Sequence, residues 1–308
     1  MSEDLETMRD LLAKKGFKVI ESPTNADIFL ASDHRKSELG LLSERASNKR
    51  FNILFRSEPE CIIPSGYKEE SLAVYDKTLT FGKPKTSPNF EFWPQFWEKS
   101  LHFKANRKEK IALINANKLN FHKTEMYSLR RKAANALEDV DLFGMDWNIS
   151  FASKMKIFVI ELRKDPLRSL FSFPFHIDKW FLNWPKIEAP KDKIKLLQEY
   201  KYALVIENSQ SYMSEKLFDA LKSGCIPIYV GPRVEDFGIP PELVIQSPAS
   251  LSGIKVAIKK AKSLDFLQHQ KNILEWLQDP ETIAKYSGEQ VLNRAIEEMK
   301  IGFQQFNL

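Results

Sequence analysis

The chain has 308 residues, of which 43% are hydrophobic and 28% are charged. This composition is typical of folded globular proteins and excludes a disordered or collagen-like chain. The 46 basic and 41 acidic residues give a formal net charge of +5, which suits an anionic ligand as well as a nucleic acid. Two cysteines cannot build a disulfide framework, so they favour a reducing compartment.

The N-terminal sequence MSEDLETMRDLLAKKGF begins with acidic residues and lacks the apolar core of a signal peptide. No apolar run approaches the roughly 18 residues that a membrane-spanning helix requires. The basic residues form short clusters without the interleaved aromatic residues of an RNA-binding surface. We therefore expect a cytoplasmic protein that binds no nucleic acid and has no transmembrane segment. Peripheral association with a membrane through the basic clusters stays open.

Helix and strand patterns alternate in the first third of the chain, which predicts a small α/β domain. The predicted elements are a helix over 3–15 ended by Gly16, strands at 17–20 and 27–31, a helix over 36–46, and strands at 51–55 and 72–75. A stretch rich in proline and aromatic residues, 82–105, is interpreted as a connector.

A second series of α/β elements follows the connector. The predicted elements are a strand from Ile111 to Asn115, a helix over 126–137, a strand at 140–143, a helical region over 151–200, a strand at 202–206, a helix over 214–223, a strand at 225–230, and helices over 251–263 and the C-terminal segment. The aromatic cluster of the helical region favours internal packing over a membrane-surface patch; its members are Phe171, Phe173, Phe175, Trp180, Phe181 and Trp184.

Two such series predict an α/β fold with two Rossmann-like domains, 1–105 and 106–308, whose parallel sheets face a central cleft. Ligands in open parallel sheets bind beyond the carboxyl ends of the strands. We therefore expect the binding site after Ile114, Ile206 and Val230.

The segment VIENSQSYMSEKLFDALKSGCIPIYVGP, residues 205–232, carries the most chemical information. A buried strand leads into Glu207, and Ser214 is suited to cap the helix that follows. Lys216 beside the start of that helix would offer a phosphate or diphosphate both an ammonium group and free backbone N–H groups. A plain capped helix with a surface lysine fits these residues equally well.

The segment resembles the signature of the family-10 glycosyltransferases, the α1,3/α1,4-fucosyltransferases. The resemblance is carried by Glu207-Asn208-Ser209, Tyr212-Met213-Ser214-Glu215-Lys216, Gly224, Ile226-Pro227-Ile228 and Gly231-Pro232. The loop between Ser209 and Tyr212 is shorter than in the family pattern, and Ser214 stands where threonine is commoner. Upstream, the resemblance extends to Asn115 at a strand end, to Arg130 in a helix, and to the sequence VDLFG at 140–144.

The resemblance implies a GT-B-like fold with an acceptor-side first domain and a nucleotide-sugar donor domain. It implies an inverting transfer of fucose from GDP-fucose to a hydroxyl of an acceptor glycan, through an α1,3 or α1,4 linkage to a GlcNAc-type sugar. Glu58 aligns with the general base, with Glu60 as the alternative. Arg130, with Arg131 as the alternative, and Lys216 would neutralise the diphosphate.

The remaining signature residues would complete the donor site. Glu215 would stabilise positive charge on the sugar or bind one of its hydroxyls. The other donor contacts implied are Asn115, Glu207, Asn208, Tyr212 and Ser214. A related transferase that uses another GDP-sugar and a non-catalytic protein that binds sugar nucleotides are the alternatives.

No metal site is expected, because none of the five histidines has a partner at metal-ligand spacing. The sequence Asp139-Val140-Asp141 matches the metal-binding D-x-D pattern, but it lies at the start of a strand, away from the expected ligand edge. We interpret it as structural. The reaction is expected to require no cofactor, although Mn²⁺ or Mg²⁺ could stimulate it through GDP.

Overall fold

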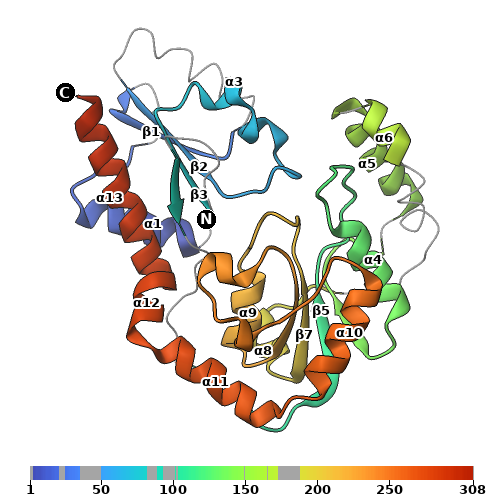
Figure 1. Ribbon diagram of the computed structural model, residues 1–308. Helices are drawn as coiled ribbons and strands as arrows, with labels where there is room; N and C mark the ends of the chain where they lie inside the picture. The colour runs from blue at the N-terminus through green and yellow to red at the C-terminus, as the bar shows by residue number, and fades with distance from the viewer. Residues whose placement is uncertain are drawn as a thin grey trace. The chain divides into compact units, whose positions relative to one another are not determined.

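A computed structural model describes residues 3–20, 25–34, 50–81, 89–92, 101, 103–148, 150–164, 166–172 and 188–307 (Figure 1). The chain divides into two compact units. Unit 1 comprises Met1–Glu98 and Pro280–Leu308, and unit 2 comprises Lys99–Asp279. Both units are α/β structures built on a parallel sheet, which confirms the predicted fold class.

Unit 1 contains a four-stranded sheet in the order β1-β2-β3-β4, with every neighbouring pair parallel. Its strands are β1 (Ile28–Ser32), β2 (Phe51–Arg56), β3 (Lys77–Phe81) and β4 (Asn89–Phe92). The predicted strands at 27–31 and 51–55 are confirmed. β4 lies inside the stretch interpreted as a connector, so that interpretation is wrong for these four residues.

Two other strand predictions for unit 1 are wrong. Residues 17–20 follow α1 (Glu3–Lys14) in irregular backbone, where the side chains of Val19 and Ile20 are exposed. Residues 72–75 lie at the end of α3 (Glu69–Leu72) and in the turn after it. The apolar side chains of this turn pack against Leu54 on one face of the sheet, which explains why the run resembled a strand. The predicted helix over 36–46 lies outside the described residues.

The C-terminal helix α13 (Gly288–Phe306) completes the core of unit 1 (Figure 1). Val291, Ala295 and Met299 recur at a spacing of four residues along it and pack against β2 and β3 at Phe51 and Leu79. We had expected the terminal helices in the second domain with residues 106–279. The structure instead groups α12 (Pro280–Tyr286) and α13 with unit 1.

Unit 2 contains a five-stranded sheet in the order β6-β5-β7-β8-β9, again entirely parallel. Its strands are β5 (Lys108–Ile114), β6 (Val140–Phe143), β7 (Tyr200–Ile206), β8 (Ile226–Val230) and β9 (Ile245–Gln246). Helices α4 (Tyr127–Ala136) and α10 (Leu251–Lys262) pack on one face. Helices α8 (Lys193–Leu197) and α9 (Lys216–Lys222) lie on the other, and α11 (Phe266–Gln278) packs beside α9 (Figure 1). The predicted unit of two parallel strands joined by a helix, β7-α9-β8, is confirmed.

Helices α5 (Phe151–Lys164) and α6 (Pro166–Ser172) pack against each other. Ile157 and Phe158 of α5 pack against Leu119 and Phe121. Phe171 is 77% exposed, so it does not pack internally as predicted, and the other members of the aromatic cluster lie outside the described residues. Of the helices that the structure describes, none combines the length and apolarity needed to span a membrane.

Replacing Met299 by alanine tests whether α13 belongs to the core of unit 1. The side chain is buried against the sheet, so we expect Met299→Ala to lower the free energy of unfolding by about 2–4 kcal/mol. Lys300→Ala, at the neighbouring exposed position, is the control and should change it by less than about 0.5 kcal/mol. Equal stability of the two variants in urea denaturation would contradict this packing.

Candidate functional site

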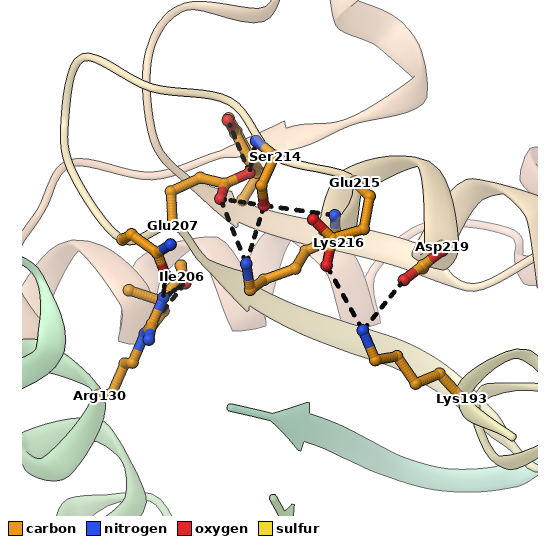
Figure 2. Close-up of polar contacts among 10 residues, drawn as sticks. Arg130, Lys193, Ile206, Glu207, Ser214, Glu215, Lys216 and Asp219 are labelled. Atoms are coloured by element: carbon orange, nitrogen blue, oxygen red, sulfur yellow. Dashed lines mark hydrogen bonds and ion pairs between the residues drawn. The ribbon is translucent and has the colours of Figure 1, made fainter. Parts of the chain in front are cut away.

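A buried carboxylate organises the loop after β7. The side chain of Glu207 has no exposed surface. It accepts hydrogen bonds from the backbone N–H and the hydroxyl of Ser214, at 3.0 and 2.6 Å, and its Oε2 lies 3.9 Å from Nζ of Lys216 (Figure 2). The Tyr229 hydroxyl donates to the same carboxylate at 3.4 Å. Burial raises the pKa of Glu207, and Lys216 and Ser214 act in the opposite direction. Glu207 therefore anchors both ends of the loop from inside the fold.

The glycine after β8 makes room for this anchor. A Cβ atom at Gly231 would lie 2.3 Å from the Tyr229 hydroxyl oxygen and 2.9 Å from Cγ of Glu207. Any larger residue would displace one of these two side chains. The glycine of the sequence signature is thus explained by packing around Glu207.

Ser214 acts differently from the predicted helix cap. Helix α9 begins at Lys216, with Glu215 at the N-cap position, so the helix is shorter than the predicted 214–223. The Ser214 hydroxyl donates to Glu207 and accepts from Nζ of Lys216 at 2.9 Å. It also accepts from the Lys216 backbone N–H at 3.5 Å, so it holds both the lysine side chain and the first residue of the helix. Tyr212, two residues earlier, is half-buried, and its N–H donates to the Ser209 carbonyl at 3.5 Å.

The carboxyl end of β7 is also held by Arg130, which is 1% exposed. Its guanidinium donates twice to the Ile206 carbonyl, at 3.2 and 2.7 Å, and once to the Asn208 side-chain oxygen at 2.8 Å. Arg131 is fully buried and donates to the Lys118 carbonyl at 3.1 Å. The structure thus brings Arg130 to the predicted site, where its contacts orient the strand end and Asn208.

Asn115 follows β5 at the same edge of the sheet. Its side chain is 3% exposed, and neither its amide nitrogen nor its amide oxygen has a hydrogen-bond partner within the described structure. Its backbone carbonyl accepts from the Trp147 indole at 2.7 Å. Gly144, at φ +135°, passes so close that a Cβ atom would lie 2.0 Å from this carbonyl oxygen. A buried, unpaired amide is costly and therefore indicates a group that binds something else.

A hollow lies between the sheet and helices α8 and α9. Its lining includes Ile114 of β5, Val205 of β7, and the charged residues Lys193, Lys216 and Asp219. Lys216 is about one-fifth exposed, whereas Glu215 beside it is half-exposed. Burial acts to raise the pKa of Glu215, but the charges of Lys216 and Lys193 hold it below its ordinary value. The hollow therefore brings two ammonium groups and the Asp219 carboxylate, whose pKa burial raises, to the predicted edge, with the Glu215 carboxylate beside it.

The predicted base Glu58 lies in unit 1, in the loop after β2. Asp33, which directly follows β1, accepts hydrogen bonds from the N–H groups of Ser57 and Glu58, at 2.8 and 3.0 Å, and from the Ser57 hydroxyl at 2.6 Å. The Tyr67 hydroxyl donates to the Glu58 carbonyl at 3.0 Å, and burial raises the pKa of Tyr67 to about 12. The backbone of Glu58 is therefore held from two sides. Glu60 is half-buried in the same loop.

Both aspartates of the D-x-D sequence form ion pairs with lysine side chains. Asp139 pairs with Lys262 at 2.6 Å, and Asp141 pairs with Lys110 at 2.8 Å and accepts from the Tyr200 hydroxyl at 2.9 Å. Across the described part of the chain, no three His, Cys, Asp or Glu side chains form a group suited to a metal ion. These contacts agree with the structural interpretation of the two aspartates.

Sequence reasoning missed Asp33 and Lys193. Asp33 could have been found, because it lies close to the carboxyl end of a predicted strand, as Glu207 and Asn115 do. Lys193 lies in the run KDKIK and carries no comparable signal. Only the packing of α8 beside α9 brings it to the hollow.

Comparison with known proteins relates the segment that carries this site to a protein family. The model of the glycosyltransferase family 10 (fucosyltransferase) C-terminal domain matches residues 147–265, which include the Glu207 loop, Lys216 and Lys193. Residues 147–265 are therefore similar to the C-terminal domain of the family-10 glycosyltransferases. The resemblance drawn from the signature residues is thereby confirmed.

Individual proteins resemble the chain over segments of different length. It is 52% identical over 52 residues to an alpha-(1,4)-fucosyltransferase of Arabidopsis thaliana, a segment that spans 16% of this chain and 13% of the relative. The fold is similar to that of a solved α1,3-fucosyltransferase, with a TM-score of 0.57, 14% identity, and coverage of 96% of this chain and 84% of the other. A crystal structure of an α1,3-fucosyltransferase with GDP gives a TM-score of 0.53, with 14% identity and coverage of 99% and 87%. These likenesses agree with the predicted GT-B-like fold.

Removal of the buried carboxylate tests its anchoring role in unit 2. Glu207→Ala leaves the N–H and the hydroxyl of Ser214 without their acceptor and removes the carboxylate paired with Lys216, so we expect a loss of about 3 kcal/mol or more in unfolding free energy. Glu215→Ala removes the same charge at a half-exposed position and should cost less than about 1 kcal/mol. Chemical denaturation measures both, and a Glu207→Ala variant as stable as Glu215→Ala would show that Glu207 is not an anchor.

Proposed function

We propose that the protein transfers fucose from GDP-fucose to a hydroxyl of an acceptor glycan, with inversion at the anomeric carbon. The observation that carries this proposal is the position of the hollow that Lys193 and Lys216 line. It lies over the carboxyl-terminal halves of β5 and β7, and both lysines belong to the segment that the family-10 model matches. The structure of a fold neighbour with GDP supports the choice of nucleotide. The acceptor is a GlcNAc-type oligosaccharide, linked through α1,3 or α1,4, and the reaction takes place in the cytoplasm.

Lys216 neutralises the negative charge that grows on the departing diphosphate. Its ammonium is held by the Ser214 hydroxyl at 2.9 Å and lies 3.9 Å from the buried Glu207 carboxylate. A cation fixed in this way stabilises a transition state without reorganising when the charge develops. The reaction requires no metal cofactor, and Mn²⁺ or Mg²⁺ stimulates it only by interacting with GDP.

Other residues at this edge bind or orient the donor. The unpaired amide of Asn115 donates to and accepts from polar groups of the nucleotide sugar. Arg130 acts chiefly through Asn208, which it orients by a 2.8 Å hydrogen bond. Glu215 accepts a hydrogen bond from a sugar hydroxyl or stabilises the positive charge that develops on the sugar ring. Tyr212 contacts the ribose or the diphosphate.

Glu58 is the general base that takes the proton of the acceptor hydroxyl. An ionised carboxylate within hydrogen-bond reach of that hydroxyl is sufficient for this role. Asp33 and Tyr67 support it, because they fix the backbone on either side of the Glu58 side chain. Glu60 in the same loop is the alternative base.

Release of GDP in the presence of GDP-fucose and an N-acetyllactosamine or Lewis-type acceptor tests the proposed activity. We expect acceptor-dependent release of GDP and a fucosylated product in mass spectrometry. A panel of GDP-sugars separates fucose from other donors, since a true donor also raises the melting temperature. Turnover with a different GDP-sugar would change the assignment of the donor sugar. Binding of a GDP-sugar without turnover on any acceptor would favour a non-catalytic protein that binds sugar nucleotides.

Glu58→Gln tests the base. The amide keeps the shape of the side chain but cannot take a proton, so we expect kcat to fall by about 100-fold or more while the affinity for GDP is unchanged. Glu60→Gln is the matched control and should retain kcat within a few-fold. The reverse result, a large loss only in Glu60→Gln, would assign the base to Glu60.

A further inference from the structure

A second lysine shares the hollow with Lys216 but belongs to a different helix. Lys193 is the first residue of α8, and both lysines line the same hollow. Figure 2 shows the Lys193 side chain extending toward Glu215 and Asp219, beside the loop that carries Lys216. Two ammonium groups from separate elements therefore border one space at the end of the sheet.

The present partners of Lys193 hold it loosely. Its Nζ lies 3.4 Å from Oε1 of Glu215 and 3.9 Å from Oδ2 of Asp219, and its side chain is 49% exposed. Asp219 has a second cation, Lys222, at 3.4 Å. Half-exposed ion pairs of this length contribute little to stability. Lys193 can therefore leave these carboxylates for a stronger acceptor at little cost.

A diphosphate is such an acceptor. A diphosphate carries more negative charge in total than a single carboxylate. The ammonium group of a lysine, on its flexible side chain, can donate up to three hydrogen bonds to it. Lys216 alone supplies one fixed ammonium, which already lies near the buried Glu207 carboxylate. A second cation across the hollow would balance the remaining charge of the ligand.

We propose that Lys193 is a second diphosphate-binding residue, which exchanges its ion pair with Glu215 for the diphosphate of the ligand. This inference rests on the proposed function, in which Lys216 binds the same diphosphate. The exchange has a second effect, because it releases the Glu215 carboxylate to accept a hydrogen bond from a hydroxyl of the donor. Lys193 thus couples diphosphate binding to the availability of Glu215.

Calorimetric titration with GDP and with inorganic pyrophosphate tests the inference. We expect Lys193→Ala to weaken the binding of both ligands by about 10-fold or more, as the loss of a charge-assisted hydrogen bond does. Lys216→Ala, the positive control, should weaken both as well. Lys195→Ala removes the same charge from an exposed position of the same helix, outside the lining of the hollow, and should bind within about twofold of the unchanged protein. Circular dichroism and melting temperature verify that each variant is folded.

Glu215→Gln separates direct binding from a purely structural role. If Lys193 binds the diphosphate, Glu215→Gln releases Lys193 from its ion pair and removes a negative charge near the ligand. Pyrophosphate should then bind more tightly to Glu215→Gln than to the unchanged protein. Adding Lys193→Ala to Glu215→Gln should then reverse this gain. If Lys193 served only to hold Glu215, Glu215→Gln would weaken binding as much as Lys193→Ala does, and this result would overturn the inference.

The ligands also separate this inference from the proposed function. Unchanged affinity of Lys193→Ala for both ligands would overturn the role of Lys193 and leave the proposed function intact. The unchanged protein could bind pyrophosphate but not GDP, with Lys193→Ala weakening the binding of pyrophosphate. This result would reject GDP-sugars as donors but support the role of Lys193 in diphosphate binding. Binding of neither ligand to the unchanged protein would overturn both.

Discussion

The buried contact between Glu207 and Ser214 is the constraint on which the candidate site of unit 2 depends. A carboxylate without exposed surface is tolerated only where donors surround it. Here the donors are the N–H and hydroxyl of Ser214 and the hydroxyl of Tyr229, with the Lys216 ammonium close by. These contacts close the loop after β7 and place Lys216 at the edge of the hollow. The signature residues Glu and Ser are therefore first of all a support for the lysine that follows them.

Both units contain a buried carboxylate that follows a strand and accepts hydrogen bonds from a serine in a neighbouring loop. In unit 1, Asp33 directly follows β1 and accepts a backbone N–H and a hydroxyl from Ser57, just as Glu207 directly follows β7 and accepts both from Ser214. Each carboxylate ties a strand end to a loop that carries a predicted functional residue, Glu58 in one unit and Lys216 in the other. The two buried carboxylates thus support loops that carry partly exposed side chains. The guanidinium of Arg130 also supports its neighbours, since its hydrogen bonds go to the Ile206 carbonyl and to Asn208.

Sequence patterns predicted unit 2 better than unit 1, for physical reasons. The strands of unit 2 are continuous apolar runs such as IPIYV, buried on both faces between helices, which leaves little ambiguity. In unit 1, β3 reads KTLTF and is interrupted by polar residues, whereas the apolar run at 72–75 packs from a turn. The apolar face of α13 was visible in its four-residue spacing, but this spacing does not specify which sheet covers it. The signature predicted the residues of the Glu207 loop and Lys216, but it could not show that Arg130 is buried. Lys193 reaches the hollow only through the packing of α8 on α9.

The central claim is that a nucleoside diphosphate binds at the carboxyl ends of β5 and β7, between the Glu207 loop and α8. Hydrogen–deuterium exchange of the protein with and without saturating GDP tests this claim directly, since backbone amides that a ligand orders exchange more slowly. The account predicts slower exchange in residues 207–216 and 188–197, with unchanged exchange in α10, which covers the opposite face of the sheet. Unchanged exchange in both of those segments at saturating GDP, or slowing confined to α10, would contradict it.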